Sequence, residues 1–265
     1  MLWRKILAAA ALSSLFALTA VSGRAADVKG EDAKDGKNAK AKNSAVIPEA
    51  RAKDKRWMTM HEDFVRQAKA GGAEVLFLGD SITDAWGGKG HNEKAAGTQV
   101  FAKEFAPMKT VNFGIGGDRT QHVLWRLQNG ELGNYFQPKV VMLMIGTNNS
   151  RDNTAEEIAE GIKADVNEIH KLSPKTKVLL LAVFPRGEKP TPTRDKLKRV
   201  NEIIAKLDDG GKTVKYLDIG DKFLPPSADG ILSKEIMPDF LHLSPKGYQI
   251  WADAVKGPIK ELLAN

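Results

Sequence analysis

The sequence predicts an α/β fold, a three-layer doubly wound domain whose five-stranded sheet is mostly parallel. From residue 74 onward, short apolar segments alternate with helical segments, which is the order of β–α–β units. The segments "KVVMLMI" at 139–145 and "KVLLLAV" at 177–183 are almost continuously apolar, as expected for strands covered on both faces. The five strands are expected at 74–78, 110–113, 139–145, 177–183 and 214–217.

Helical segments surround these strands. The first is expected over 57–70, ahead of the first strand. Thr154 and Glu157 form a capping-box pattern for a helix over 154–172. Apolar residues at helical spacing predict another helix over 193–208. Ser244-Pro245, a cap residue followed by proline, opens the last helix.

The N-terminal residues 1–26 have the layout of a secretory signal peptide. Arg4 and Lys5 precede an apolar run over 6–21, and small residues follow. The run is shorter than the roughly 20 residues of a membrane span. We therefore expect cleavage after residue 25 or 26, export to the periplasm or outside the cell, and no stable membrane insertion afterwards. An uncleaved anchor is the alternative.

Composition divides the remaining chain in two. Residues 27–56 are rich in Lys, Asp, Ala and Gly, which predicts a flexible charged linker, or a surface tether, before a domain over 57–265. The formal net charge of +7 is distributed as +3 in 1–26, +3 in 27–56 and +1 in the domain. A nucleic-acid-binding domain usually carries a basic patch on the fold itself. No nucleic-acid partner is therefore expected.

The residue inventory limits the chemistry. The chain has no cysteine, which excludes disulfides, thiolate nucleophiles and cysteine-based zinc sites. His61, His91, His122 and His170 are scattered without metal-ligand spacing. No metal and no cofactor is expected.

Glycine and polar residues gather where three of the expected strands end. Gly79-Asp80-Ser81 follows the first strand, "GIGGD" at 114–118 the second and "GTNN" at 146–149 the third. In open α/β sheets, sites form beyond the carboxyl ends of the strands. Asp239 and His242 lie three residues apart just before the last helix.

These residue types fit acyl transfer, which needs a nucleophile, a base, a group that orients the base, and oxyanion donors. Ser81 is the candidate nucleophile, His242 the base and Asp239 the orienting carboxylate. The N–H groups of Ser81 and Gly117, with the side-chain amide of Asn148, are the candidate oxyanion donors. Glycine at 117 would let the backbone approach a substrate closely.

Each segment alone also has a structural interpretation. Gly-Asp-Ser is a common turn, and "GTNN" could be an Asn-rich turn. "GIGGD" lacks the spacing and the following Lys-Ser/Thr of phosphate loops. Asp239 and His242 could form a local pair at a helix start. We favour a site because the four signals occur together, in the order Ser, Gly, Asn, His.

The sequences of these segments and their order along the chain resemble those of the SGNH hydrolases, also called GDSL-type esterases. "FLGDSIT", "NFGIGGD", "GTNN" and "DFLHLS" are similar to the four family blocks. "HVLWRLQNGEL" at 122–132 and "PRG" at 185–187 make the chain most similar to the catalytic subunits of the platelet-activating-factor acetylhydrolase branch. The resemblance spans about residues 57–255 and implies the roles given above for the triad and the oxyanion hole. Asn149 stands where much of the wider family has aspartate.

The expected function is that of an exported serine esterase that acts on short-chain esters, acetyl foremost, through an acyl-enzyme. Asp80, Gly116 and Asn149, beside the catalytic groups, are the expected substrate contacts. A small-molecule or carbohydrate ester is the expected substrate, because the chain has no long apolar lid segment and only 7% aromatic residues. A lysophospholipase or other lipid acylhydrolase, and a non-catalytic binding module, are the alternatives. The resemblance permits a homodimer.

Overall fold

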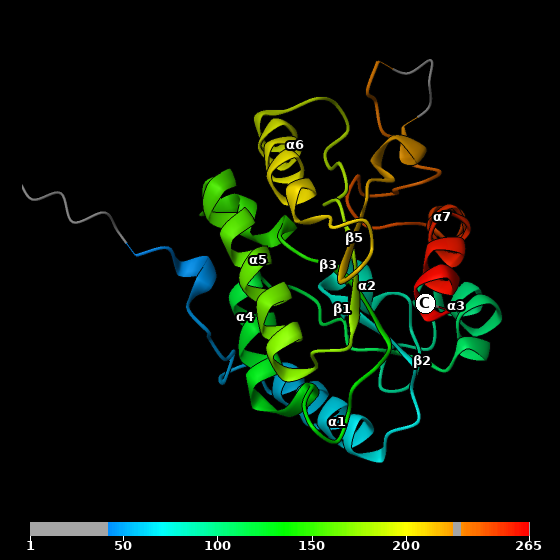
Figure 1. Ribbon diagram of the computed structural model, residues 1–265. Helices are drawn as coiled ribbons and strands as arrows, with labels where there is room; N and C mark the ends of the chain where they lie inside the picture. Colours follow the sequence, from blue (N-terminus) through cyan, green and yellow to red (C-terminus); the bar gives the residue numbers. More distant parts are fainter. Residues whose placement is uncertain (1–41, 225–228, 265) are drawn as a thin grey trace, which may run out of the picture. The chain divides into compact units, whose positions relative to one another are not determined.

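A single parallel sheet organises the folded part of the chain (Figure 1). The computed structural model describes residues 42–224 and 229–264. Its strands run in the order β2-β1-β3-β4-β5, and every neighbouring pair is parallel. They are β1 Val75–Gly79, β2 Thr110–Asn112, β3 Val140–Met144, β4 Lys177–Leu181 and β5 Val214–Leu217. The predicted fold class and all five predicted strands are confirmed.

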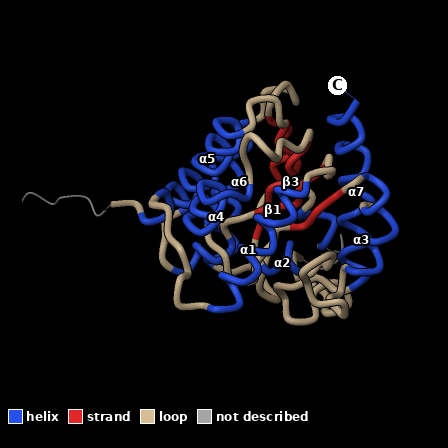
Figure 2. The backbone as a smooth tube through the Cα atoms, turned by 90° about the horizontal axis from the view of Figure 1, so that it is seen from below, coloured by secondary structure: helices blue, strands red, loops and turns tan. Residues whose placement is uncertain are grey.

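Helices cover both faces of the sheet, which makes three layers (Figures 1 and 2). One face carries α1 Lys55–Ala70, α4 Thr120–Arg126, α5 Ala155–Leu172 and α6 Pro192–Ile204. The other carries α3 Thr98–Glu104 and α7 Pro245–Ala264. Successive side chains of a strand point to opposite faces. Leu76 and Leu78 therefore join one core, and Val75 and Phe77 the other.

Local signals set several helix ends as predicted. Thr154 Oγ1 accepts a hydrogen bond from the Glu157 N–H, and the Glu157 carboxylate accepts one from the Thr154 N–H. This is the predicted capping box of α5. Ser244 precedes Pro245 at the start of α7, and its hydroxyl accepts from the Gly247 N–H at 3.2 Å. The short helices α2 Ser81–Asp84 and α3, as well as α4, had no sequence prediction.

The folded unit begins earlier than the sequence predicts. It runs from Lys42, so the last part of the expected linker over 27–56 is packed against the domain. Ala45 is fully buried, and its carbonyl accepts a hydrogen bond from Thr120 Oγ1 at 2.8 Å. Asn43 Nδ2 donates to Glu160 on α5 at 2.8 Å. Most of the contacts that hold this segment are polar. Its low apolar content therefore led to the incorrect prediction that residues 42–54 belong to a flexible linker.

The prediction of export depends on residues 1–26, which lie outside the residues that the structure describes. The apolar run over 6–21 and the first part of the expected linker lie outside the described residues. Within 42–224 and 229–264, no helix is long and apolar enough to cross a membrane.

Candidate active site

Ser81 is positioned by the end of strand β1, which lies between β2 and β3. Gly79 ends the strand, and Ser81 is the first residue of α2. A Cβ on Gly79 would lie 2.3 Å from both the Met144 carbonyl oxygen and Thr83 Oγ1. Only glycine lets the backbone of β1 pass this closely between β3 and α2. The chain therefore turns sharply and holds Ser81 at the carboxyl edge of the sheet.

Ser81, His242 and Asp239 form one hydrogen-bonded chain. Ser81 Oγ lies 2.9 Å from His242 Nε2. His242 Nδ1 lies 2.7 Å from Asp239 Oδ2. Asp239 Oδ1 in turn accepts hydrogen bonds from the backbone N–H groups of Leu241, at 3.1 Å, and His242, at 2.7 Å. The structure thus brings together three residues that the sequence separates by up to 161 positions.

The electrostatics of the Asp239 carboxylate suit a partner of imidazole. Burial alone would raise its pKa, but the hydrogen bonds from the side chain and backbone of His242 outweigh burial and lower it below the ordinary value. Asp239 therefore stays ionised at neutral pH. An ionised carboxylate on Nδ1 keeps the proton there and leaves the Nε2 lone pair directed at Ser81.

The three candidate oxyanion donors come from the ends of three neighbouring strands. Asn148 Nδ2 donates one hydrogen bond to the Asp118 carbonyl at 2.8 Å, which leaves its second N–H available. Gly117 is exposed and has φ +82°, a backbone conformation that favours glycine. Ser81 opens a helix, where backbone N–H groups have no intrahelical acceptor.

The loop between β2 and α4 is fixed by charged side chains on both sides of Gly116. Its N–H donates to Asp84 Oδ2 at 3.0 Å, and its carbonyl accepts from Arg51 Nη1 at 2.7 Å. Asp84 also bonds His91 Nδ1 at 2.7 Å. Both backbone polar groups of Gly116 are occupied, so its expected role as a substrate contact is not supported.

Asp80 and Asn149 were expected to contact substrate, and this expectation is wrong because both side chains are fully buried. Asp80 Oδ1 accepts from the Ile82 N–H at 3.0 Å, so the residue caps α2. Burial raises the pKa of Asp80 to about 7. Asn149 Oδ1 accepts from the Thr120 N–H at 3.0 Å, and its amide donates to Gln121. Both residues hold the segments that carry Ser81 and Asn148.

Beneath the loop lies a buried ionic network that the sequence did not reveal. Asp118 Oδ2 accepts from Arg126 Nε at 2.9 Å, and Asp118 Oδ1 accepts from Trp57 Nε1 at 2.7 Å. Arg126 Nη1 donates to Glu131 Oε2 at 2.5 Å, and Glu131 Oε1 lies 2.8 Å from His61 Nδ1. Asp118, Arg126 and Glu131 have no exposed surface. Burial raises the pKa of Asp118 to about 6, against the opposing effect of Arg126.

This network bears directly on the oxyanion donors. The backbone carbonyl of Asp118 is the group that orients the Asn148 amide. Arg51 Nη1 contacts both the Gly116 carbonyl and, at 3.2 Å, the Asp118 carboxylate. The charges therefore hold Gly117 between two anchored neighbours. The part of "HVLWRLQNGEL" that supplies Arg126 and Glu131 was the only sequence signal for this arrangement.

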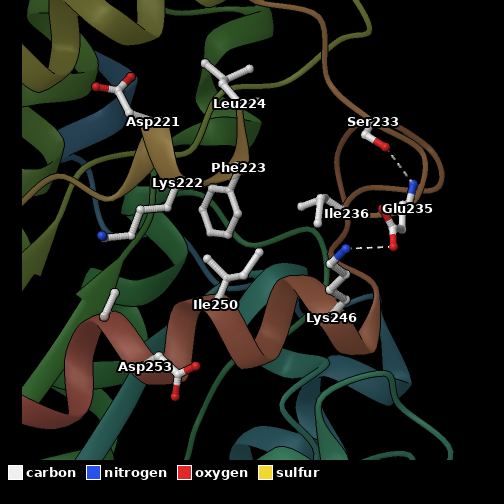
Figure 3. A pocket seen from close by; sticks show the side chains of 11 residues that line it. Asp221, Lys222, Phe223, Leu224, Ser233, Glu235, Ile236, Lys246, Ile250 and Asp253 are labelled. Atoms are coloured by element: carbon white, nitrogen blue, oxygen red, sulfur yellow. Dashed lines mark hydrogen bonds and ion pairs between the residues drawn. The ribbon is translucent and has the colours of Figure 1, made fainter. Parts of the chain in front are cut away.

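A cavity of about 560 Å³ opens beside these donors, with Gly117 and Asn148 in its wall. Its remaining lining is polar, with arginine and hydroxyl side chains. A larger cavity of about 700 Å³ lies between α7 and the segment Gly220–Phe223 (Figure 3). Phe223 and Ile250 line it, and none of the predicted site residues does. Of these two cavities, only the polar one is lined by residues predicted for the site, namely Gly117 and Asn148. Across 42–224 and 229–264, no cluster of three or more potential metal ligands occurs.

The chain is similar in sequence and in fold to known proteins. Residues 77–250 match the GDSL-like lipase/acylhydrolase family. The alpha1 subunit of platelet-activating factor acetylhydrolase IB from Rattus norvegicus is 40% identical over 212 residues, which cover 80% of this chain and 86% of that protein. A GDSL-like lipase from Bacteroides thetaiotaomicron shares the fold, with a TM-score of 0.61 and 19% identity over 76% of this chain and 97% of its own. An acetyl xylan esterase from Geobacillus stearothermophilus also shares the fold, with a TM-score of 0.53 and 19% identity over 72% of this chain and 95% of its own.

Proposed function

The chain belongs to the GDSL-like lipase/acylhydrolase family and is a carboxylic ester hydrolase, and from this premise we propose that it is a serine esterase for short acyl groups, acetyl foremost. The observation that carries the proposal is the hydrogen-bonded chain from Ser81 through His242 to Asp239, at 2.9 and 2.7 Å. A binding module that only retained the fold would have no need of this alignment.

In the acylation step, His242 acts as the general base. Its Nε2 takes the proton of Ser81 as Oγ attacks the ester carbonyl. Asp239 stabilises the imidazolium that forms. The tetrahedral oxyanion accepts hydrogen bonds from the N–H groups of Ser81 and Gly117 and from the free N–H of Asn148. As the intermediate collapses, His242 gives its proton to the departing alcohol.

Deacylation repeats these steps with water. His242 takes a proton from a water molecule, which attacks the acyl group on Ser81. The same donors hold the second oxyanion. Collapse releases the carboxylic acid, and the proton returns to Ser81. The His242 side chain is 41% exposed, so water can reach the position from which it must attack.

Two features support acetyl esters of carbohydrate as the substrate class. The 40%-identical relative is by name an acetylhydrolase, which supports a short acyl group. The cavity beside the oxyanion donors is lined by polar residues, among them Thr191 and Thr193, rather than by an apolar surface, which supports a hydroxyl-rich alcohol. The name of the same relative supports a second candidate, the acetyl ester of a phospholipid. The proposal also includes export, which depends on residues 1–26 alone.

The test is hydrolysis of p-nitrophenyl acetate, butyrate and octanoate by the purified protein, beside Ser81→Ala. Ser233→Ala, on the larger cavity, is the matched control. We expect acetate cleavage to be abolished in Ser81→Ala and retained in Ser233→Ala, with rates that fall as the acyl chain lengthens. Equal rates in the wild type and Ser81→Ala would refute the assignment of the nucleophile. Rates that rise with chain length would favour a lipid substrate.

A further inference from the structure

The cavity beside the oxyanion donors carries an unusual charge. Its charged lining residues are Arg119, Arg151 and Arg186, and no carboxylate lines it. Arg119 contacts Asp152 at 2.6 Å, but Asp152 is not part of the lining. Arg151 is exposed and has no ion-pair partner among the described residues. The cavity wall therefore has an excess of positive charge that the protein itself only partly neutralises.

Two further features add to the positive potential of this cavity. Thr191 and Thr193 place the first turn of α6, a helix of 13 residues, in its wall. The N-terminal end of a helix carries partial positive charge. Lys196 lies just behind the wall, where its Nζ donates to the Ser150 carbonyl at 2.8 Å. Three guanidinium groups and one helix end therefore line a single space, with one ammonium group behind its wall, and Asp195 in the first turn of α6 is not part of the lining.

The chemistry of arginine indicates what the space would bind. The planar guanidinium group matches carboxylate and phosphate oxygens in a two-bond geometry and holds its charge at any physiological pH. Arg186 is partly ordered already, because its Nη1 lies 3.3 Å from Thr147 Oγ1. Gly117 and Asn148 belong to the same wall. An anionic group bound in the cavity would thus lie beside the oxyanion donors, where it could belong to the same molecule as an ester held at Ser81.

We propose that this cavity is a subsite for an anionic group on the substrate, and that the substrate is an acetyl ester of an acidic, uronate-bearing carbohydrate. The inference rests on the proposed function and narrows it. A carbohydrate fits better than a lipid because the side chains around the arginines are hydroxyls and amides, such as Thr147, Ser150 and Thr193. The cavity lining contains no aliphatic or aromatic side chain against which a hydrocarbon chain could pack.

The experiment compares two acetylated oligosaccharides that differ in charge. One is an acetylated oligogalacturonide, and the other is a neutral acetylated xylo-oligosaccharide of similar length. Acetate release gives kcat/KM for each with the full-length protein. We expect kcat/KM to favour the acidic substrate by about tenfold or more, since a hydrogen bond to a charged group contributes that much to affinity. The preference should fall as salt is added, because salt screens exposed charges.

Arg151→Gln and Arg186→Gln test the residues themselves. Each substitution should raise KM for the acidic substrate about threefold to tenfold. The lower figure applies where the arginine is exposed to solvent, because solvent weakens its interaction with the anion. The ratio of acidic to neutral kcat/KM should fall with it. Arg66→Gln, in which the lost arginine pairs with Asp63 on α1, is the matched control and should keep the wild-type ratio.

The outcomes separate the two proposals. Equal kcat/KM on both oligosaccharides, or an acidic preference that survives Arg151→Gln and Arg186→Gln together, would overturn the subsite while the esterase remains. Arginine-dependent hydrolysis of a 1-alkyl-2-acetyl-glycerophosphate, with neither sugar cleaved, would overturn the carbohydrate assignment. Failure of the esterase itself would show as inertness toward p-nitrophenyl acetate and every other ester.

Discussion

Replacing Asp239 by asparagine should disable the base without disturbing the fold. Asp239 Oδ1 accepts two backbone N–H groups, at 2.7 Å from His242 and 3.1 Å from Leu241. An asparagine oxygen would keep both bonds, so its amide NH₂ would face His242 Nδ1. A donor at that position forces Nδ1 to become an acceptor, and the ring proton moves to Nε2. His242 would then donate to Ser81 Oγ and could not take its proton.

The expected loss in kcat is large. The same substitution in a Ser-His-Asp enzyme lowers kcat by about 10⁴. The Asp239 side chain is 56% exposed, so water can compete for the imidazole and the geometry is less tightly enforced than in a buried triad. We therefore expect a loss of about 10³ to 10⁴ in kcat. Stability should change by no more than about 0.5 kcal/mol, as for other exposed positions.

The assay is p-nitrophenyl acetate hydrolysis at about pH 8, with urea unfolding measured in parallel. Asp253→Asn is the matched control, because the Asp253 side chain is 58% exposed and lies on α7 away from the triad. It should behave like the wild type in both measurements. If Asp239→Asn retained kcat within about tenfold of the wild type at unchanged stability, Asp239 would not set the tautomer, and the reasoning would be refuted.

Three further predictions concern the groups around the triad. Asn148→Ala should lower kcat for p-nitrophenyl acetate by about 10² to 10³, and a near-wild-type rate would remove Asn148 from the oxyanion hole. Arg126→Met removes the buried arginine that pairs with both Asp118 and Glu131 and should cost about 3–5 kcal/mol in urea unfolding, so a loss below about 1 kcal/mol would contradict the network. Asp80 has a pKa of about 7, so between about pH 4 and pH 7 the native state holds a proton that the unfolded chain releases, and stability falls as pH rises. Asp80→Asn cannot titrate, so its free energy of unfolding relative to the wild type should increase from about pH 4 to pH 8, and a constant difference would contradict the raised pKa.

The layered fold was predictable because burial leaves a clear pattern in the sequence. Strands β3 and β4 are covered on both faces, and that coverage requires nearly continuous apolar runs over 139–145 and 177–183. The capping box at Thr154 is equally local. The strand order β2-β1-β3-β4-β5 was not predicted, since it depends on pairing between distant segments.

The site was predictable to the extent that its chemistry demanded particular residue types. Ser81, Asp239 and His242 stood out as a candidate nucleophile and its partners near predicted element ends, and the structure places the three in one hydrogen-bonded chain. Asp80 and Asn149 were misassigned because a polar residue that lines a site and one that is buried beneath it look alike in a sequence. Burial distinguishes them, and burial depends on the tertiary structure.

Charged residues gave the weakest signal. Arg51 and Arg126 resemble ordinary solvent-exposed arginines when read one position at a time. Trp57 and Asp118, which meet at 2.7 Å in the network, are 61 residues apart. The segment over 42–54 was assigned to a linker for the same reason, because its contacts are polar and their partners are distant in sequence.

That docked N-terminal segment has a consequence for the order of folding. Its partners come much later in the chain, 65 residues on for Arg51 with Gly116 and 117 residues on for Asn43 with Glu160. Contacts between distant residues form late, because a long loop must close first. The first stretch of the folded unit therefore cannot dock through local contacts alone, and the loop that carries Gly117 gains its contact with Arg51 only after a long loop has closed. Esterase activity, which also needs Ser81 and His242 to meet across 161 residues, should accordingly lag behind helix formation during refolding.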